Sequence, residues 1–238
     1  MQINTIERLE WDSQFLGYPV AKISLDQDGG DYLENLFQQI KSEKIRLTYF
    51  FAPPSEQELN SRIAEKGSVL VDQKVVFSKT TEKHNKFSND ITEFRGTEIN
   101  ERLRELVLMA GIFSRFRIDE NFTNNEYERI YTEWISKSVK KIIAFKTLVA
   151  IKGSDLIGIT TLGEKSNYAD IGLVAVDGNF KGQGIGSDLI QTADTIAFDM
   201  GFKEIKVVTQ HENKGACRLY EKCNFHIERI TNIYHFWN

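Results

Sequence analysis

The chain has 238 residues, of which 41% are hydrophobic and 27% are charged, and its formal net charge is −4. Such a composition is typical of a globular protein with one large or two small domains. The charge gives no basic surplus for a nucleic-acid partner, and no apolar run approaches the roughly 18–20 residues that cross a bilayer. The first ten residues lack the basic start and apolar centre of a signal peptide. We therefore expect a soluble, cytoplasmic protein with no nucleic-acid or membrane partner.

The two cysteines, Cys217 and Cys223, lie close together late in the chain. On a helix they would point to different faces, so a disulfide is not expected. Cysteine and histidine residues do not cluster with the spacing of a zinc site. The sequence therefore predicts reduced thiols and no metal.

The first part of the chain, residues 1–80, has the pattern of a small mixed α/β domain. Turn residues, short apolar runs and helical stripes alternate through it. The predicted elements are a strand at the end of residues 9–23, an amphipathic helix with its apolar stripe over 33–40, a strand over 45–51, a short helix between a capping box at 55–58 and Gly67, and one bent or two short strands over 69–77.

Residues 81–90 are polar and without periodicity, which predicts a linker to a second domain over residues 91–238. The elements of that domain follow the order β-α-α-β-β-β-α-β-α-β. They are a strand over 91–95, helices over 100–112 and 124–139, two antiparallel strands over 147–151 and 156–162 joined by a glycine turn, a strand over 171–176 followed by a helix, a strand over 204–209, a helix over 213–222, and a long strand over 225–237 that could form a hairpin at 229–232.

A glycine-rich turn, Lys181-Gly-Gln-Gly-Ile-Gly186, joins the strand over residues 171–176 to the next helix. The first N–H groups of a helix have no internal partner and form the positive end of its dipole. Glycines let an anion approach those groups, so this turn predicts a phosphate site. It matches neither the dinucleotide fingerprint nor the P-loop, which needs Lys before Ser187.

The same turn resembles the pyrophosphate loop of the GNAT family of N-acetyltransferases, with Lys181 where that family usually has Arg or Gln. A second segment, Asn213-Lys-Gly-Ala-Cys-Arg-Leu-Tyr-Glu-Lys-Cys-Asn-Phe225, is similar to another motif of the family, with Asn224 in place of Gly. The resemblance implies an α/β (α+β) fold: a mixed, mostly antiparallel central sheet flanked by helices, after a smaller N-terminal α/β domain that shapes the acceptor site.

The cofactor implied by the resemblance is acetyl coenzyme A (acetyl-CoA). The predicted strand would bind the pantetheine arm through its backbone, with an oxyanion donor near Leu173 or Val174. The loop would hold the pyrophosphate. The residues expected to bind the cofactor are Leu173, Val174, Ala175, Val176, Lys181, Gly182, Gln183, Gly184, Ile185, Gly186, Ser187, Asn213 and Ala216.

Tyr220 is the candidate general acid for the leaving thiolate, because a phenol is protonated at pH 7 and lies on the same helical face as Asn213. The alternative is a tyrosine that only packs under the cofactor. The general base stays open, with His211, Glu212 and a water chain as candidates.

The acceptor is the part that the sequence identifies least well. Residues 114–117 contain Arg115 and Arg117, which suit the phosphates of a substrate, although either could simply pair with a nearby acid. Trp11, Phe15 and Tyr18 could stack on a nucleobase or form a hydrophobic staple.

Within the family, this segment and residues 131–134, 208–210 and 234–237 resemble bacterial enzymes that acetylate a TDP-linked 4-amino-4,6-dideoxy sugar. A TDP- or UDP-linked amino sugar for surface polysaccharide is therefore the expected acceptor, and a homodimer is compatible with the resemblance. The alternatives are a protein N-terminus or another small amine, and a module that binds acetyl-CoA without catalysis.

Overall fold

The computed structural model describes residues 6–26, 31–87 and 89–238. By their contacts the residues form two units, one ending at Val75 and joined by Ile230–Asn238, and the other made of Val76–Arg229. This division differs from the predicted ranges, because the end of the last strand belongs with the first unit. The separate roles predicted for 1–80 and 91–238 stay predictions. None of the described helices is long and apolar enough to cross a membrane.

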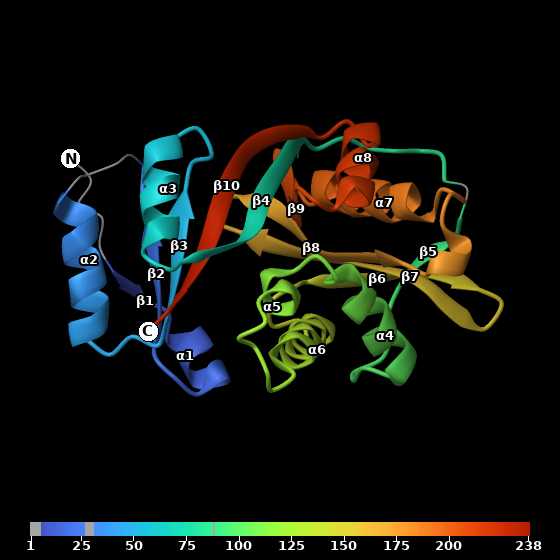
Figure 1. Cartoon of the computed structure of the whole chain (residues 1–238). Coiled ribbons are helices and arrows are strands. Elements are labelled where there is room, and N and C mark those ends of the chain that lie inside the picture. Colours follow the sequence, from blue (N-terminus) through green and yellow to red (C-terminus); the bar gives the residue numbers. More distant parts are fainter. Residues whose placement is uncertain (1–5, 27–30, 88) are drawn as a thin grey trace. The chain divides into compact units, whose positions relative to one another are not determined.

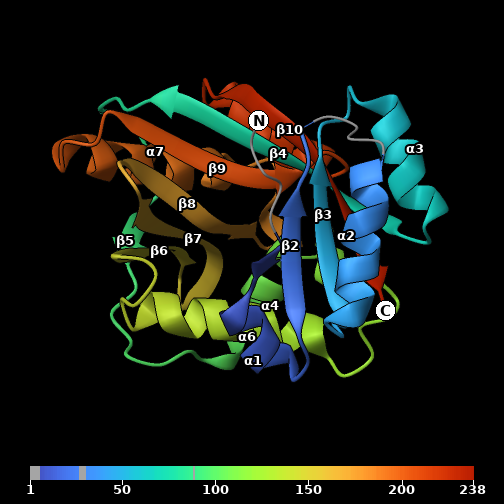
Figure 2. The same ribbon diagram turned by 90° about the vertical axis from the view of Figure 1, so that its left-hand side faces the viewer.

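The first unit is a sheet with helices packed on it (Figure 2). Its strand order is β1-β2-β3-β10, and only the β2–β3 pair is parallel. The ring of Phe37 lies 5.0 Å from Phe50 and 4.9 Å from Phe236, which ties α2 to two strands of the core. The elements are β1 (Glu7–Arg8), α1 (Glu10–Leu16), β2 (Val20–Ser24), α2 (Asp31–Ser42), β3 (Leu47–Ala52), α3 (Gln57–Glu65), the start of β4 (Val69–Thr80) and the end of β10 (His226–Trp237).

Local sequence explains two differences from the predicted elements of this unit. Residues 10–16 form the short helix α1. The Ser13 hydroxyl donates to Leu9 O at 2.7 Å and accepts from Val20 N at 2.9 Å, which joins this helix to the start of β2. The predicted capping box is wrong, because the N-cap of α3 is Glu56 and makes no side-chain capping bond. The Asn60 amide instead links the helix to the segment before it by donating to Pro53 O.

The second unit is a mixed sheet with helices on both faces. Its strands follow the order β4-β9-β8-β7-β6-β5, with α4, α5 and α6 on one side and α7 and α8 on the other (Figure 1). The β5–β6, β6–β7 and β7–β8 pairs are antiparallel, and the β8–β9 pair is parallel. The remaining elements are β5 (Ile91–Glu93), α4 (Glu101–Ala110), α5 (Arg115–Ile118), α6 (Glu126–Val139), β6 (Lys146–Lys152), β7 (Asp155–Lys165), β8 (Tyr168–Val176), the 3₁₀ turn η1 (Gly178–Phe180), α7 (Ile185–Asp199), β9 (Glu204–Gln210) and α8 (Lys214–Lys222).

The predicted element order of this unit is confirmed except for α5, a single turn that Ser114 caps by accepting from Phe116 N. Gly153 takes the positive φ of +63° that the predicted β6–β7 turn requires, and Asn224 takes a φ of +65° after α8. The hairpin suggested at residues 229–232 is wrong: β10 continues through them as one strand. No glycine or proline interrupts this stretch, so nothing reverses the chain there.

The polar residues 81–90 form no helix or strand in the described chain, but they are not a free connection. His84 N donates to the Thr195 hydroxyl at 3.1 Å, and the Lys83 ammonium pairs with Asp199 at 2.9 Å. We call the described residues 81–87 and 89–90 the α7 strap, because they follow the polar face of that helix.

A buried ion pair lies under the strap. The Lys79 ammonium is 2.9 Å from Asp194 Oδ2, and the two side chains are 6% and 1% exposed. His84 Nε2 lies 2.8 Å from the same oxygen. Glu82, His84 and Asp194 could geometrically hold a metal ion, but Lys79 already supplies a positive charge to Asp194 and Glu82.

Replacing Lys79 by Met should lower the free energy of unfolding by about 3–5 kcal/mol, because it removes the buried cation that pairs with the Asp194 carboxylate. The measurement is urea denaturation at pH 8. Lys83→Met is the matched control, since its ion pair is exposed and contributes at most about 1 kcal/mol. Equal effects of the two variants would contradict this account of the pair.

Candidate active site

The site is organised by two parallel strands that pair only at their beginnings. The recorded β8–β9 register covers Ala169, Asp170 and Ile171 of β8. Beyond it β8 continues to Val176 and β9 to Gln210. The two strands therefore separate beyond these residues, which leaves one edge of β8 without a strand partner along residues 172–176.

A bulge in the β7–β8 ladder determines which backbone groups of β8 lie at this edge. The register shifts between Thr160 and Leu162, and the Leu173 N–H donates to the Thr161 hydroxyl at 2.9 Å. A Cβ at Gly172 would lie 2.8 Å from that hydroxyl, so glycine is needed there. The bulge adds one residue to β8 and changes which amides face β7.

The direction of the later amides follows from alternation along the strand. Asp177 N donates to Ile157 O at 2.8 Å, so residue 177 faces β7. Hydrogen-bonded and non-bonded pairs alternate in an antiparallel ladder, which directs Ala175 to β7 as well. The backbone groups of Val174 and Val176 therefore face the gap. The sequence placed the free donor near Leu173 or Val174, and the Leu173 amide is occupied by Thr161.

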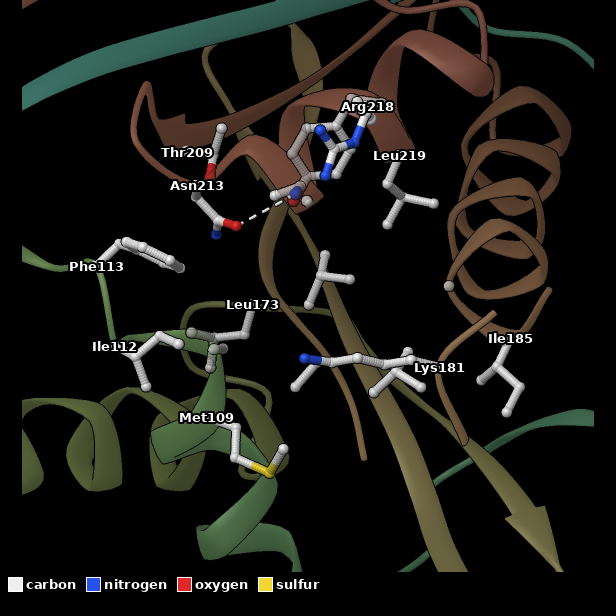
Figure 3. Close-up of a pocket in the computed structure, with 18 of the residues that line it drawn as sticks. Met109, Ile112, Phe113, Leu173, Lys181, Ile185, Thr209, Asn213, Arg218 and Leu219 are labelled. Atoms are coloured by element: carbon white, nitrogen blue, oxygen red, sulfur yellow. Dashed lines mark hydrogen bonds between the residues drawn. The ribbon is translucent and has the colours of Figure 1, made fainter. Parts of the chain in front are cut away.

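The glycine loop lies at the start of α7. Gly182 and Gly184 have φ values of +80° and +84°, which other residues rarely adopt. Gly184 is the N-cap of α7, with no side-chain cap. The N–H groups that follow it are those that a helix leaves without an internal acceptor. The Lys181 side chain is exposed and extends into the cavity (Figure 3).

The third glycine of the motif has a packing role. A Cβ at Gly186 would meet the Leu219 side chain at 3.1 Å, so glycine lets α7 approach α8 closely. Gly182, Gly184, Ile185, Gly186 and Ser187 line the cavity, whereas Gln183 is not among its lining residues.

Asn213 opens α8 beside this loop. Its side-chain oxygen accepts from Ala216 N at 3.2 Å and caps the helix (Figure 3). The capping bond uses the oxygen and leaves the amide NH₂ without a partner in the described chain. Asn213 and Ala216 both line the cavity.

Tyr220 lies on the same face of α8 and is 4% exposed. Its ring packs 5.5 Å from Phe77 and 6.2 Å from Phe225. Burial raises the pKa of its phenol above the usual value near 10. No described residue hydrogen-bonds the hydroxyl, and Tyr220 contributes to the cavity lining. Tyr220 thus borders the cavity as a neutral phenol.

The cavity formed by these parts has a volume of about 720 Å³. Figure 3 shows Met109, Ile112 and Phe113 on one side and Ile185 and Leu219 on the other. We call Met109, Ile112 and Phe113 the apolar wall. It comes from the end of α4 and the turn after it. These residues were not predicted as part of a site, because apolar side chains at these positions also suit a helix facing a core.

The charges around the cavity are of one sign. Lys181, Arg218 and Lys222 line it, and its described lining contains no Asp, Glu or His. Arg218 and Lys222 were not predicted, since exposed cations on an amphipathic helix are ordinarily solvated. The base candidates His211 and Glu212 do not line it: His211 Nδ1 lies 3.1 Å from the Lys214 ammonium and 3.6 Å from Glu212.

Comparison with known proteins matches the part of the chain that forms this site to a protein family. Residues 112–225, which contain β8, the glycine loop and α8, match the sequence profile described as the Acetyltransferase (GNAT) family. The chain contains a GNAT acetyltransferase domain. It is an acyltransferase, and the GNAT family uses acetyl-CoA.

Curated and solved relatives extend the likeness beyond this domain. The chain is 26% identical over 226 residues to dTDP-fucosamine acetyltransferase from Escherichia coli O6:H1, covering 94% of each chain. A GNAT protein from Sphaerobacter thermophilus shares the fold with a TM-score of 0.62 and 16% identity, over 98% of this chain and 76% of that one. The PaiA N-acetyltransferase of Thermoplasma acidophilum, solved with coenzyme A, has a TM-score of 0.51 and 20% identity, over 64% of this chain and all of that one.

The two arginines predicted to bind substrate phosphates lie outside the cavity lining of the GNAT domain. The Arg117 guanidinium is 3.9 Å from Glu128 and 5.3 Å from the Tyr127 ring centre. Arg115 lies over the Phe116 ring at 4.8 Å. Their role toward a substrate stays a prediction.

The remaining candidates divide between the two units. In the first unit Trp11 and Phe15, which lie four residues apart on α1, stack on each other at 5.0 Å. In the GNAT domain Cys217 and Cys223 are free thiols, and burial raises the pKa of both.

The Thr161 hydroxyl should be necessary for the bulge. Thr161→Val leaves the buried Leu173 N–H without an acceptor, which should lower the free energy of unfolding by about 1–3 kcal/mol. Thr161→Ser keeps the hydroxyl and loses one methyl group, at a cost of about 0.8 kcal/mol. Urea denaturation of both variants tests this, and a Ser variant as unstable as the Val variant would show that the hydroxyl is not the reason.

Proposed function

We propose that the chain transfers the acetyl group of acetyl-CoA to the amine of a small acceptor, most favourably a nucleotide-linked 4-amino-4,6-dideoxy sugar. One observation carries the proposal. The free backbone edge of β8, the glycine loop, Asn213 and Tyr220 all border one cavity whose charged lining residues are cations.

The donor would lie where β8 and β9 separate. Val174 and Val176 would pair with the amide groups of the pantetheine arm as an added strand would, and the Asn213 NH₂ would donate to the same arm. The first amides of α7 and the Lys181 ammonium would hold the pyrophosphate. Arg218 and Lys222 add positive charge beside the loop, which suits the remaining phosphate of the cofactor.

The chemical step is attack of a neutral amine on the thioester carbonyl. The carbonyl oxygen becomes an oxyanion, for which we propose the Val174 N–H as donor, because the Leu173 N–H is used by Thr161. Collapse of the intermediate forms the amide bond and breaks the carbon–sulfur bond. The electron pair leaves on sulfur, and Tyr220 donates a proton to it.

The proton on the acceptor amine has no obvious recipient in the cavity. Since neither a carboxylate nor an imidazole lines the described part of it, we propose that water removes this proton.

The nature of the acceptor rests on the E. coli relative, whose identity of 26% extends over 94% of both chains. A likeness of that length includes the first unit as well as the GNAT domain. Acetylation of such a sugar would serve surface polysaccharide synthesis. A protein N-terminus or another amine is the alternative acceptor, and no residue of the cavity favours it.

Release of free thiol from acetyl-CoA should be fastest with a TDP- or UDP-linked 4-amino-4,6-dideoxy sugar. The panel includes both nucleotide carriers, the free amino sugar, peptides with free N-termini and a small polyamine. Turnover on peptides with none on any sugar nucleotide would overturn the acceptor assignment. Binding of acetyl-CoA without turnover on any amine would support a non-catalytic module instead.

Tyr220→Phe should lower kcat by about 10²-fold or more, because it removes the proton donor, while the Kd for acetyl-CoA changes little. Since the pKa of this phenol is raised, the acid form persists above its ordinary pKa. The wild-type kcat should therefore rise with pH as the amine deprotonates and show no fall below about pH 10. An unchanged kcat in the Phe variant would leave Tyr220 only a packing role.

A further inference from the structure

The α7 strap contains a side chain that touches the glycine loop. The Asn89 amide nitrogen lies 3.2 Å from the carbonyl oxygen of Gln183 and 2.7 Å from Oδ2 of Asp188. A Cβ built at Gly184 would be 3.8 Å from the same nitrogen. One side chain from a distant part of the chain thus bridges the last peptide of the loop and the first turn of α7.

The first of these bonds fixes the direction of a peptide unit. In a planar trans peptide the carbonyl and the following N–H point in opposite directions. Asn89 does not line the cavity, whereas Gly184 does. Holding the Gln183 carbonyl toward Asn89 therefore turns the Gly184 N–H away from the strap and toward the cavity.

The loop needs such a restraint because its own residues hold the backbone only weakly in one conformation. Gly182 and Gly184 both have positive φ, and glycine populates either sign of φ readily. The α7 N-cap also has no side-chain bond of its own. Without an outside partner the peptide between Gln183 and Gly184 can rotate, and its N–H then leaves the anion site.

The second bond places a negative charge. Asp188 is in the first turn of α7 and is 5% exposed. Its backbone N–H donates to Gly184 O at 3.0 Å. Because a carboxylate near a phosphate would repel it, the Asn89 donor also keeps Asp188 Oδ2 bonded on the strap side.

We infer that Asn89 is a positioning residue for the phosphate-binding loop, which it orients through the Gln183 carbonyl and Asp188. This rests on the proposed function, because the ligand is the pyrophosphate of acetyl-CoA. Asn89 touches no reacting atom. It acts on the affinity of the loop for phosphate, and so on the binding of the donor rather than on the chemical step.

Asn89→Ala should raise the Kd for coenzyme A and the KM for acetyl-CoA about 5- to 10-fold, because it removes one hydrogen bond that pre-organises the site. The kcat at saturating acetyl-CoA should not change. Asn89→Asp places an oxygen against two oxygens and should weaken binding further. Lys83→Gln is the control, because it loosens the same strap at an exposed ion pair far from the loop residues.

Two readouts separate positioning from general stability. Calorimetric titration gives the Kd for coenzyme A, and backbone NMR follows the Gly184 and Ile185 amide signals of the free protein, which should move in the Asn89 variants alone. A wild-type Kd in Asn89→Ala, or an equal rise in Lys83→Gln, overturns the inference. A wild-type protein that binds no coenzyme A at all overturns the proposed function, and this inference with it.

Discussion

Where β8 and β9 stop pairing, the protein leaves backbone groups that must find another partner. Buried N–H and C=O groups are almost always hydrogen-bonded in folded proteins, since an unmade bond costs about 1–3 kcal/mol. The recorded pairing ends at Ile171 and Val207, yet both strands continue. The proposed cofactor arm would pair with this edge at Val174 and Val176, and the cavity, the loop and α8 are arranged around it.

A second constraint is the placement of charge. The whole chain is acidic, with a formal net charge of −4, but Lys181, Arg218 and Lys222 line the cavity without a carboxylate in its described lining. The acids of α7 lie on its other side, where Lys79, Lys83 and Asn89 hold Asp194, Asp199 and Asp188. The helix thus presents its N-terminus and glycines to an anion while its carboxylates are bonded to the strap.

Local patterns predicted those parts of the site that lie within one short segment. Sequence alone predicts the loop from Lys181 to Gly186, because a turn fixes it. It also predicts that Asn213 and Tyr220 lie together, because they share one helical face. Asn89 was not predictable, since its partners lie about 94 and 99 residues away and a polar stretch without periodicity indicates a linker. Arg218 and Lys222 were missed for a related reason: only the tertiary packing of α8 shows that its outward cations border a cavity.

The same distinction applies to the fold. Alternation and turn chemistry predicted the β6–β7 turn at Gly153, where one residue decides the geometry. They missed α1, where hydrogen bonds of the Ser13 hydroxyl accompany a helix in an aromatic segment that showed no helical pattern. They also suggested a hairpin within β10, where no residue requires a turn. The bulge at Gly172 has no local signal in the sequence, because its cause is a hydroxyl on the neighbouring strand.

The environment of Tyr220 also limits what a general acid can do in this site. Its phenol is buried against Phe77 and Phe225, and its pKa is raised, whereas a free thiol has a pKa near 8.5. Full proton transfer from the phenol to the thiolate is therefore uphill by more than about 1.5 pKa units, or about 2 kcal/mol. Because burial disfavours a tyrosinate beside those rings, the phenol has to regain a proton before the next turnover. In the proposed reaction water takes the proton that the attacking amine releases, and this proton is the one available to restore Tyr220. The cost of proton donation by Tyr220 therefore depends on the amine losing its proton in the same cavity.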